Sequence, residues 1–262
     1  VYTAYLSYLK NTGTNENPSF QVISQDVGNL RSLNFRHLAP AAADLNGDLF
    51  PDLLVGTLNS GLLYLTQNPA TGTFSLQTLP NIAVQDYAKP ALIDLDNDNR
   101  IDLLVGGKTG SFQYFKNIGT VNSPMFSAET SSFSQLETVQ EGISNFGYSS
   151  PYFYIYNDTV RLFSGSESGR LFAWNVNPQG ANSIISYIDS SYQSIQDGIW
   201  TAPALADLNS DGFPELVQGN RRGGLTYYKG DVPQSLISIS QNNRSTLSIY
   251  PNPSNGSITL DV

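Results

Sequence analysis

Oxygen-bearing side chains recur in three nine-residue windows of this chain at one fixed spacing. They occupy positions 1, 3, 5 and 9, so the alternate side chains of a tight loop converge on one point, and position 7 adds a backbone carbonyl. Such an all-oxygen set suits a hard cation, and a flexible loop favours Ca²⁺ over Mg²⁺. The windows are Asp44, Asn46, Asp48, Phe50 and Asp52; Asp94, Asp96, Asp98, Arg100 and Asp102; and Asp207, Asn209, Asp211, Phe213 and Glu215.

The charge of these windows also favours a bound cation. Their 27 residues hold 10 of the 22 acidic side chains, with Arg100 as the only base. Like charges about 5 Å apart repel by roughly 3 kcal/mol per pair at an effective dielectric near 20, so an empty loop should open or take up protons. We therefore expect about three structural Ca²⁺ sites. The 44–52 loop should be the weakest, because Leu49 holds position 6, where the other loops have Asn99 and Gly212. Solvated acidic turns that cap strands are the alternative.

Each window lies inside a longer repeat that begins with proline and ends with glycine, at 40–56, 90–106 and 203–219. A fourth copy, 151–165, is two residues shorter and has lost the acidic loop. The repeat unit contains four short runs of aliphatic, aromatic and β-branched residues separated by turns, near 40–45, 51–57, 61–67 and 73–79 in the first full unit. No window shows a convincing helical period.

These features predict an all-β fold, a β-propeller of four-stranded blades. The visible part of the ring should hold about four to five blades. Residues 8–13 match 114–119, so the chain opens in the middle of a repeat. We expect propeller blades over 1–230, a polar linker over 231–246 and a truncated C-terminal β domain over 247–262.

Composition excludes several classes of function. A net charge of −9 and a pI near 4.4 argue against nucleic-acid partners. With no cysteine and one histidine, thiolate sites and histidine-clustered zinc sites lack ligands. The sequence contains no run of 18 apolar residues, which is the length that would predict a membrane span.

Aromatic side chains stand three residues before each repeat's proline. In a propeller these equivalent positions form a ring, which should lie on the face opposite the acidic loops. Such a ring could stack on sugars, or it could only seal the junctions between blades. We read Arg221, Arg222 and Lys229 as solvated charges, and no residues single themselves out as catalytic or as binding an organic cofactor. The ring residues are His37, Tyr87, Tyr148 and Trp200.

The acidic windows followed by Leu-x-x-Gly resemble the FG-GAP/VCBS repeat family, the calcium-loop blades of integrin-α-like propellers. The resemblance covers about residues 1–230 and is specific in three blades. It implies calcium ligands at the positions given above, in the hairpin that joins the first two strands of each blade. It does not extend to ligands in the 151–165 blade.

A second resemblance lies at the C-terminal end. The motif formed by Tyr250, Pro251, Asn252, Pro253 and Gly256 resembles the start of the C-terminal sorting domain of the type IX secretion system of Bacteroidota. It implies recognition by the type IX machinery and export to the cell surface or the medium.

Together these observations predict a secreted or cell-surface calcium-binding propeller that acts as a binding or adhesion module. A glycan or a surface protein is the expected ligand. The alternative is the propeller domain of a secreted polysaccharide-degrading enzyme, a lyase or a glycosidase.

Overall fold

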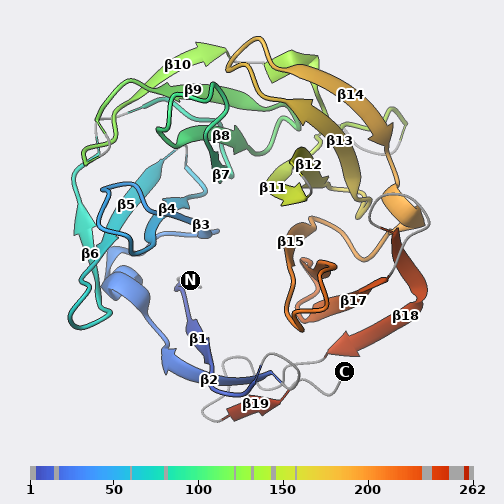
Figure 1. Ribbon diagram of the computed structural model, residues 1–262, viewed down its shortest axis with the longest axis horizontal. Coiled ribbons are helices and arrows are strands. Elements are labelled where there is room, and N and C mark those ends of the chain that lie inside the picture. The colour runs from blue at the N-terminus through green and yellow to red at the C-terminus, as the bar shows by residue number, and fades with distance from the viewer. Residues whose placement is uncertain are drawn as a thin grey trace.

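A ring of four antiparallel sheets surrounds a central axis in the computed structural model (Figure 1). The structure describes residues 4–14, 18–59, 61–79, 82–120, 122–130, 133–142, 146–156, 158–231, 238–247 and 257–259. Each sheet has four strands in chain order, which confirms the predicted all-β propeller with four-stranded blades.

The strands of the four blades are as follows. The first blade contains β3 (Ala39–Ala43), β4 (Asp52–Gly56), β5 (Leu62–Gln67) and β6 (Phe74–Gln77), and the second contains β7 (Lys89–Ile93), β8 (Asp102–Gly106), β9 (Gln113–Asn117) and β10 (Phe126–Thr130). The third contains β11 (Ser150–Tyr156), β12 (Thr159–Gly165), β13 (Phe172–Asn177) and β14 (Ile184–Asp189), and the fourth contains β15 (Ala202–Ala206), β16 (Glu215–Gly219), β17 (Leu225–Asp231) and β18 (Ser238–Leu247). The short 3-10 helices are η1 (Val27–Leu33), η2 (Phe133–Gln135) and η3 (Tyr192–Ser194).

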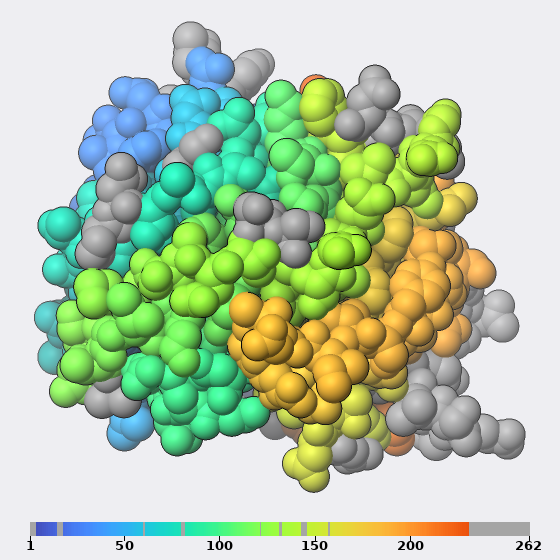
Figure 2. Space-filling view, turned by 90° about the horizontal axis from the view of Figure 1, so that it is seen from above, coloured from blue at the N-terminus to red at the C-terminus, as the bar shows by residue number. Residues whose placement is uncertain are grey.

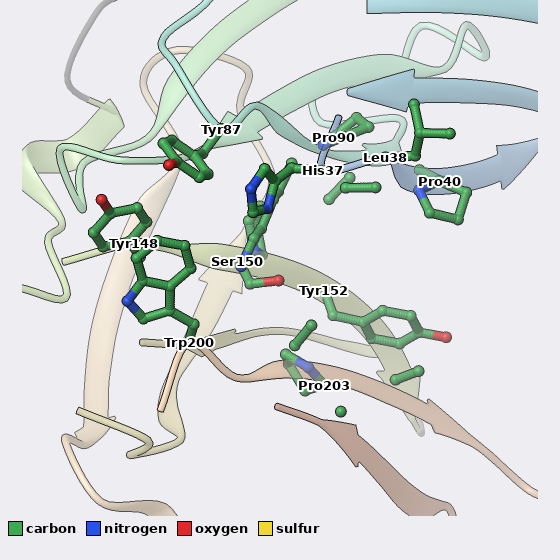
Figure 3. A pocket seen from close by; sticks show the side chains of 18 of the residues that line it. His37, Leu38, Pro40, Tyr87, Pro90, Tyr148, Ser150, Tyr152, Trp200 and Pro203 are labelled. Carbon is green, nitrogen blue, oxygen red and sulfur yellow. The ribbon is translucent and has the colours of Figure 1, made fainter. Parts of the chain in front are cut away.

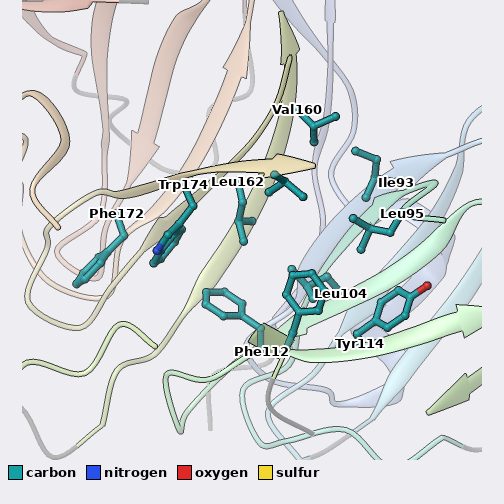
Figure 4. Packing of buried hydrophobic residues seen from close by; sticks show 11 residues of the cluster. Ile93, Leu95, Leu104, Phe112, Tyr114, Val160, Leu162, Phe172 and Trp174 are labelled. Carbon is teal, nitrogen blue, oxygen red and sulfur yellow. The ribbon is translucent and has the colours of Figure 1, made fainter. Parts of the chain in front are cut away.

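The hydrophobic core lies between adjacent blades, because each sheet must bury both faces against its neighbours. Between the second and third blades, Leu104, Tyr114 and Leu162 pack with a group of aromatic rings (Figure 4). In that group Trp174 meets Phe112 edge-on, with ring centroids 5.9 Å apart. Seen edge-on, the surface of the second blade continues into that of the third (Figure 2). The repeat is therefore also the packing unit, since equivalent strands supply equivalent core positions.

Close approach of adjacent blades explains the glycine that ends the repeat. A Cβ atom on Gly56 would lie 2.0 Å from the Ala88 carbonyl oxygen, and one on Gly165 would lie 2.2 Å from that of Thr201. Both contacts are with the backbone just before the next blade's inner strand, so only glycine fits there. At Gly219, in the last blade, the nearest atom to such a Cβ is 3.6 Å away and belongs to Leu225 of the same blade.

The N-terminal segment forms part of a further sheet. Strand β1 (Tyr8–Asn11) pairs with β2 (Ser19–Ser24), which also pairs with β19 (Ser257–Thr259). These two N-terminal strands correspond to the third and fourth strands of a blade, as the match of 8–13 with 114–119 predicts.

The C-terminal region is described in part. The segment 231–246, predicted as an irregular linker, contains most of β18, which pairs with β17 as the outermost strand of the fourth blade. This corrects the expectation. The sequence of β18 is mostly polar and has few β-branched or aromatic residues, so it resembles a linker. The sorting motif Tyr250, Pro251, Asn252, Pro253 and Gly256 lies outside the described residues. In the described part of the chain, no helix has the length and apolar character needed to cross a bilayer.

Candidate functional site

The three acidic windows form the hairpins between the first and second strands of the first, second and fourth blades. Each inner strand begins just after a ring aromatic residue and ends at the hairpin. The acidic loops therefore lie on one face of the propeller and the aromatic ring lies on the other, as the sequence predicts. In the third blade β11 and β12 pair as far as Tyr156 and Thr159, which leaves no room for an acidic loop.

Position 1 of each loop organises the backbone of the turn. A carboxylate oxygen of Asp44 accepts a hydrogen bond from the Leu49 N–H at 2.8 Å. The equivalent bonds run from the Asn99 N–H to Asp94 at 2.8 Å and from the Gly212 N–H to Asp207 at 3.0 Å. These bonds fold each loop inward on its first carboxylate.

The same backbone conformation recurs in all three loops. Positions 4 and 6 have positive φ angles throughout, and position 6 is Leu49 (71°), Asn99 (63°) or Gly212 (88°). Glycine adopts this region without strain and Asn tolerates it, whereas a leucine there is destabilised by roughly 1–2 kcal/mol. Leu49 is also 90 % exposed, so it gains no packing in return.

Position 9 is a buried carboxylate held by donors from the third strand of the blade and from the start of the acidic loop. In the second loop Asp102 is fully buried and accepts hydrogen bonds from the Tyr114 hydroxyl at 2.9 Å and from the Leu95 and Asn117 N–H groups at 3.1 and 2.8 Å. In the first loop Asp52 accepts equivalent bonds from Tyr64, Leu45 and Gln67. Burial raises the pKa of Asp52, Asp102 and Glu215, despite the hydrogen bonds that favour their charged forms.

The tyrosines behind position 9 were not predicted as part of the site. Burial, followed by the adjacent carboxylate, raises the pKa of Tyr64 and Tyr114, and it raises that of Tyr227 to about 12. Each tyrosine lies 12 residues after the position-9 acid of its own loop, at 52 and 64, 102 and 114, and 215 and 227. That constant separation is the sequence signal that would have identified them.

The second loop gathers the most carboxylates. Oxygen atoms of Asp94, Asp96 and Asp102 lie within 4.8 Å of one another. The Asp96 Oδ1 atom is buried and has no hydrogen-bond partner. An oxygen in that state is under-solvated, which a cation among the three carboxylates would correct.

Two basic side chains already compete for the second loop. The Lys116 ammonium bonds to Asp96 and lies 3.4 Å from Asp98, and the Arg100 guanidinium bonds to Asp98. Arg100 was predicted to supply only its backbone carbonyl, and Lys116 was not predicted to take part at all. Its contact depends on the pairing of β9 with β8, which brings residue 116 beside the loop.

At position 3, where the second loop has the Asp96 carboxylate, the first and third loops have an amide. The Asn46 amide donates to Asp48 at 3.1 Å and to Asp52 at 3.5 Å, and Asn209 bridges Asp211 and Glu215 at 3.0 and 3.3 Å. The amide NH₂ thus lies between two carboxylates, where positive charge is favoured. Rotation of the amide by a half-turn presents its oxygen to the same point.

The four ring aromatics meet at the opposite face, at one end of a cavity of about 790 Å³ on the propeller axis (Figure 3). The rings of Tyr148 and Trp200 are stacked with centroids 4.1 Å apart, and Tyr87 contacts both rings edge-on. His37 lies 4.8 Å from Tyr87. All four residues have positive φ angles, between 47° and 56°. Residues from all four inner strands line the cavity.

Basic residues dominate the charge of this cavity. Its lining includes Lys89 and Arg221, and none of the described lining residues is acidic. The Arg221 guanidinium lies 4.5 Å from the centre of the Trp200 ring, while Arg221 itself remains exposed. Burial lowers the pKa of His37, and Arg221, Lys89 and Arg36 lower it further.

Comparison with known families now adds to this geometry. Residues 44–105 match the family model of the FG-GAP-like repeat. The match contains the first two acidic loops and the strands between them, β4 to β7. No curated protein matches the chain. The FG-GAP-like repeat and the four-bladed ring together support a module of the binding or adhesion type.

Proposed function

We propose that this protein is a calcium-stabilised β-propeller that serves as a secreted binding module. The observation that carries the calcium proposal is the second FG-GAP-like loop, where three carboxylates converge and a buried Asp96 oxygen has no partner. The oxygen-only donor set fits a hard cation. The side chains of positions 1, 3, 5 and 9 and the position-7 carbonyl would hold the ion in each loop. Bound calcium would neutralise the buried carboxylates and fix each hairpin.

Thermal unfolding with and without calcium tests this proposal. At a free concentration 100 times Kd, each independent site stabilises the folded state by about 2.7 kcal/mol. For a chain of this size that corresponds to a rise in Tm of roughly 5–10 °C per site. The Asp96→Asn variant should lose part of the rise, whereas Asp158→Asn, in the hairpin without an acidic loop, should keep all of it. An equal Tm in EDTA and in calcium would contradict the proposal.

The ligand of the module is proposed to bind at the aromatic face, in the axial cavity. Four aromatic rings, a cavity of about 790 Å³ and unopposed positive charge meet there. Hydrolysis by paired carboxylates gains no support from this site, because the described lining offers no acid. A glycan panel tests the assignment: binding without product supports a binding module, whereas product formation supports the polysaccharide-degrading alternative.

Export is proposed from the C-terminal sequence alone. We propose that 247–262 begin a sorting domain recognised by the type IX secretion machinery, which would place the protein on the cell surface or in the medium. In a bacterium with this machinery, replacing Tyr250 to Pro253 by alanine should retain the parent protein inside the cell. Unchanged export of the variant would contradict the proposal.

A further inference from the structure

The axial cavity contains a cation without a counter-ion. Lys89 begins the inner strand of the second blade and lines the cavity. Within the described part of the chain, its ammonium makes no ion pair and no hydrogen bond. Lys89 is only half-buried, and a cation that faces a cavity without a counter-charge is available to an anionic ligand.

The repeat does not require a lysine at this position. The equivalent residues of the other blades, each just before the repeat's proline, are Ala39, Ser150 and Ala202. All three line the same cavity and are small. Burial lowers the pKa of Lys89 to about 8, so the charged form is disfavoured where it stands. A residue that differs from those at the equivalent positions of the repeat, and whose charged form is disfavoured by its surroundings, is typical of a functional position.

The surroundings of Lys89 select an anion. No acidic side chain lines the described cavity, and the second lining cation, Arg221, is already stacked on Trp200. A single ammonium with no fixed partner matches one negative charge. A carboxylate is the common organic anion with that charge at neutral pH, and its hydrogen bond to a lysine is charge-assisted.

Further hydrogen-bonding groups stand at the ring end of the cavity. The imidazole of His37 and the hydroxyl groups of Tyr87 and Tyr148 have no hydrogen-bond partner among the described residues. None of their polar atoms is sealed from solvent. Together with Lys89 they suit a ligand that carries hydroxyl groups as well as a carboxylate. The cavity volume falls within the usual range for small-molecule binding sites.

We propose that the axial cavity binds a sugar acid, whose carboxylate pairs with Lys89 and whose hydroxyl groups bond to the polar atoms of His37, Tyr87 and Tyr148. This inference rests on the proposed binding function for the place of the ligand. It adds the chemical class and the residue that selects it.

Calorimetric titration of the calcium-loaded protein tests the inference. The probes are glucuronate and galacturonate, with glucose and galactose as neutral counterparts and acetate and phosphate as simple anions. We expect the uronates to bind and the neutral sugars to bind at least about tenfold more weakly. Lys89→Met should weaken uronate binding by a similar factor, and Lys89→Arg should retain part of it. Lys108→Met, a lysine on Phe146 outside the cavity, should bind as the parent protein does.

Each other outcome overturns part or all of the inference. Equal binding of glucose and glucuronate would refute the anionic selectivity, and equal binding of acetate would refute the sugar. Binding unchanged in Lys89→Met, or no uronate binding by protein that still gains stability from calcium, would refute the site itself. In the last case the calcium proposal stands, so the two failures are distinguishable.

Discussion

Replacing Lys89 by methionine should stabilise the protein at neutral pH. The pKa of this lysine is about 8 in the folded protein, against an ordinary value of 10.5. Each tenfold change in a protonation equilibrium corresponds to about 1.4 kcal/mol, so holding the charge inside the fold destabilises it by up to about 3 kcal/mol at pH 7. Lys89 is only partly accessible, and the surface it exposes faces the cavity. Cavity water solvates the ammonium in part, and we expect a net gain of about 1–2 kcal/mol from Lys89→Met.

The pH dependence of this gain distinguishes it from improved packing. Between pH 8 and 10.5 the unfolded chain holds the Lys89 proton and the folded chain releases it, so the parent protein gains stability as pH rises. The difference between variant and parent should therefore be largest below pH 8 and disappear near pH 10.5. Urea unfolding of calcium-loaded protein at pH 7 and pH 10 measures it, with Lys108→Met as the matched control. A destabilised variant, or the same difference at both pH values, would refute the reasoning.

Three further predictions concern the acidic loops. Calcium-free protein should become more stable as the pH falls from 7 towards 4–5, because the raised pKa values of Asp52, Asp102 and Glu215 make the folded chain hold protons more tightly than the unfolded one. The lowered pKa of His37 opposes this below pH 6.5, so a Tm that only falls on acidification in EDTA would contradict the prediction. Leu49→Gly should raise the unfolding free energy by about 0.5–1 kcal/mol, because glycine adopts the positive φ of this position freely. Asn99→Gly, the control, should raise the unfolding free energy by less. An unchanged unfolding free energy in Leu49→Gly would show that the backbone at this position is not strained. Lys116→Met should bind calcium roughly two- to fivefold more tightly at the second loop, because its ammonium bonds to Asp96. Lys10→Met, at the equivalent position of the N-terminal strands, is the control, and unchanged affinity in Lys116→Met would argue against competition.

The sequence was sufficient to predict the repeating architecture. Fixed spacing from proline to glycine, with four short β-rich runs per unit, predicts the blades, and the structure confirms them. The direction of each inner strand then places acidic loops and aromatic ring on opposite faces. Gly56 shows why the pattern is so regular, since a side chain there would collide with the backbone of the next blade.

Contacts between strands were harder to predict. Lys116 reaches Asp96 only because β9 pairs with β8, and a sequence window around the loop does not contain it. Arg221 stacks on Trp200 across a hairpin connection, which its position beside Arg222 does not indicate. Strand β18 was missed because its sequence is mostly polar and lacks the run of β-branched and aromatic residues that predicts a strand.

Two features could have been predicted from the repeat itself. The tyrosines that support position 9 keep a constant separation from it, and Lys89 stands where the other blades have alanine or serine. Both features become visible when the residues at equivalent positions of different blades are compared with one another. A comparison of residues within a single motif does not reveal them. In a repeat protein, a position that departs from its equivalents is the signal of a site.

A crystal structure of the protein grown in millimolar calcium would test the central claim most directly. The account predicts an ion in each of the loops 44–52, 94–102 and 207–215, bound through the side chains of positions 1, 3, 5 and 9 and the carbonyl of position 7. Loops without ions at that concentration, with Lys116 still on Asp96 and the Asn46 amide still between its two carboxylates, would contradict it.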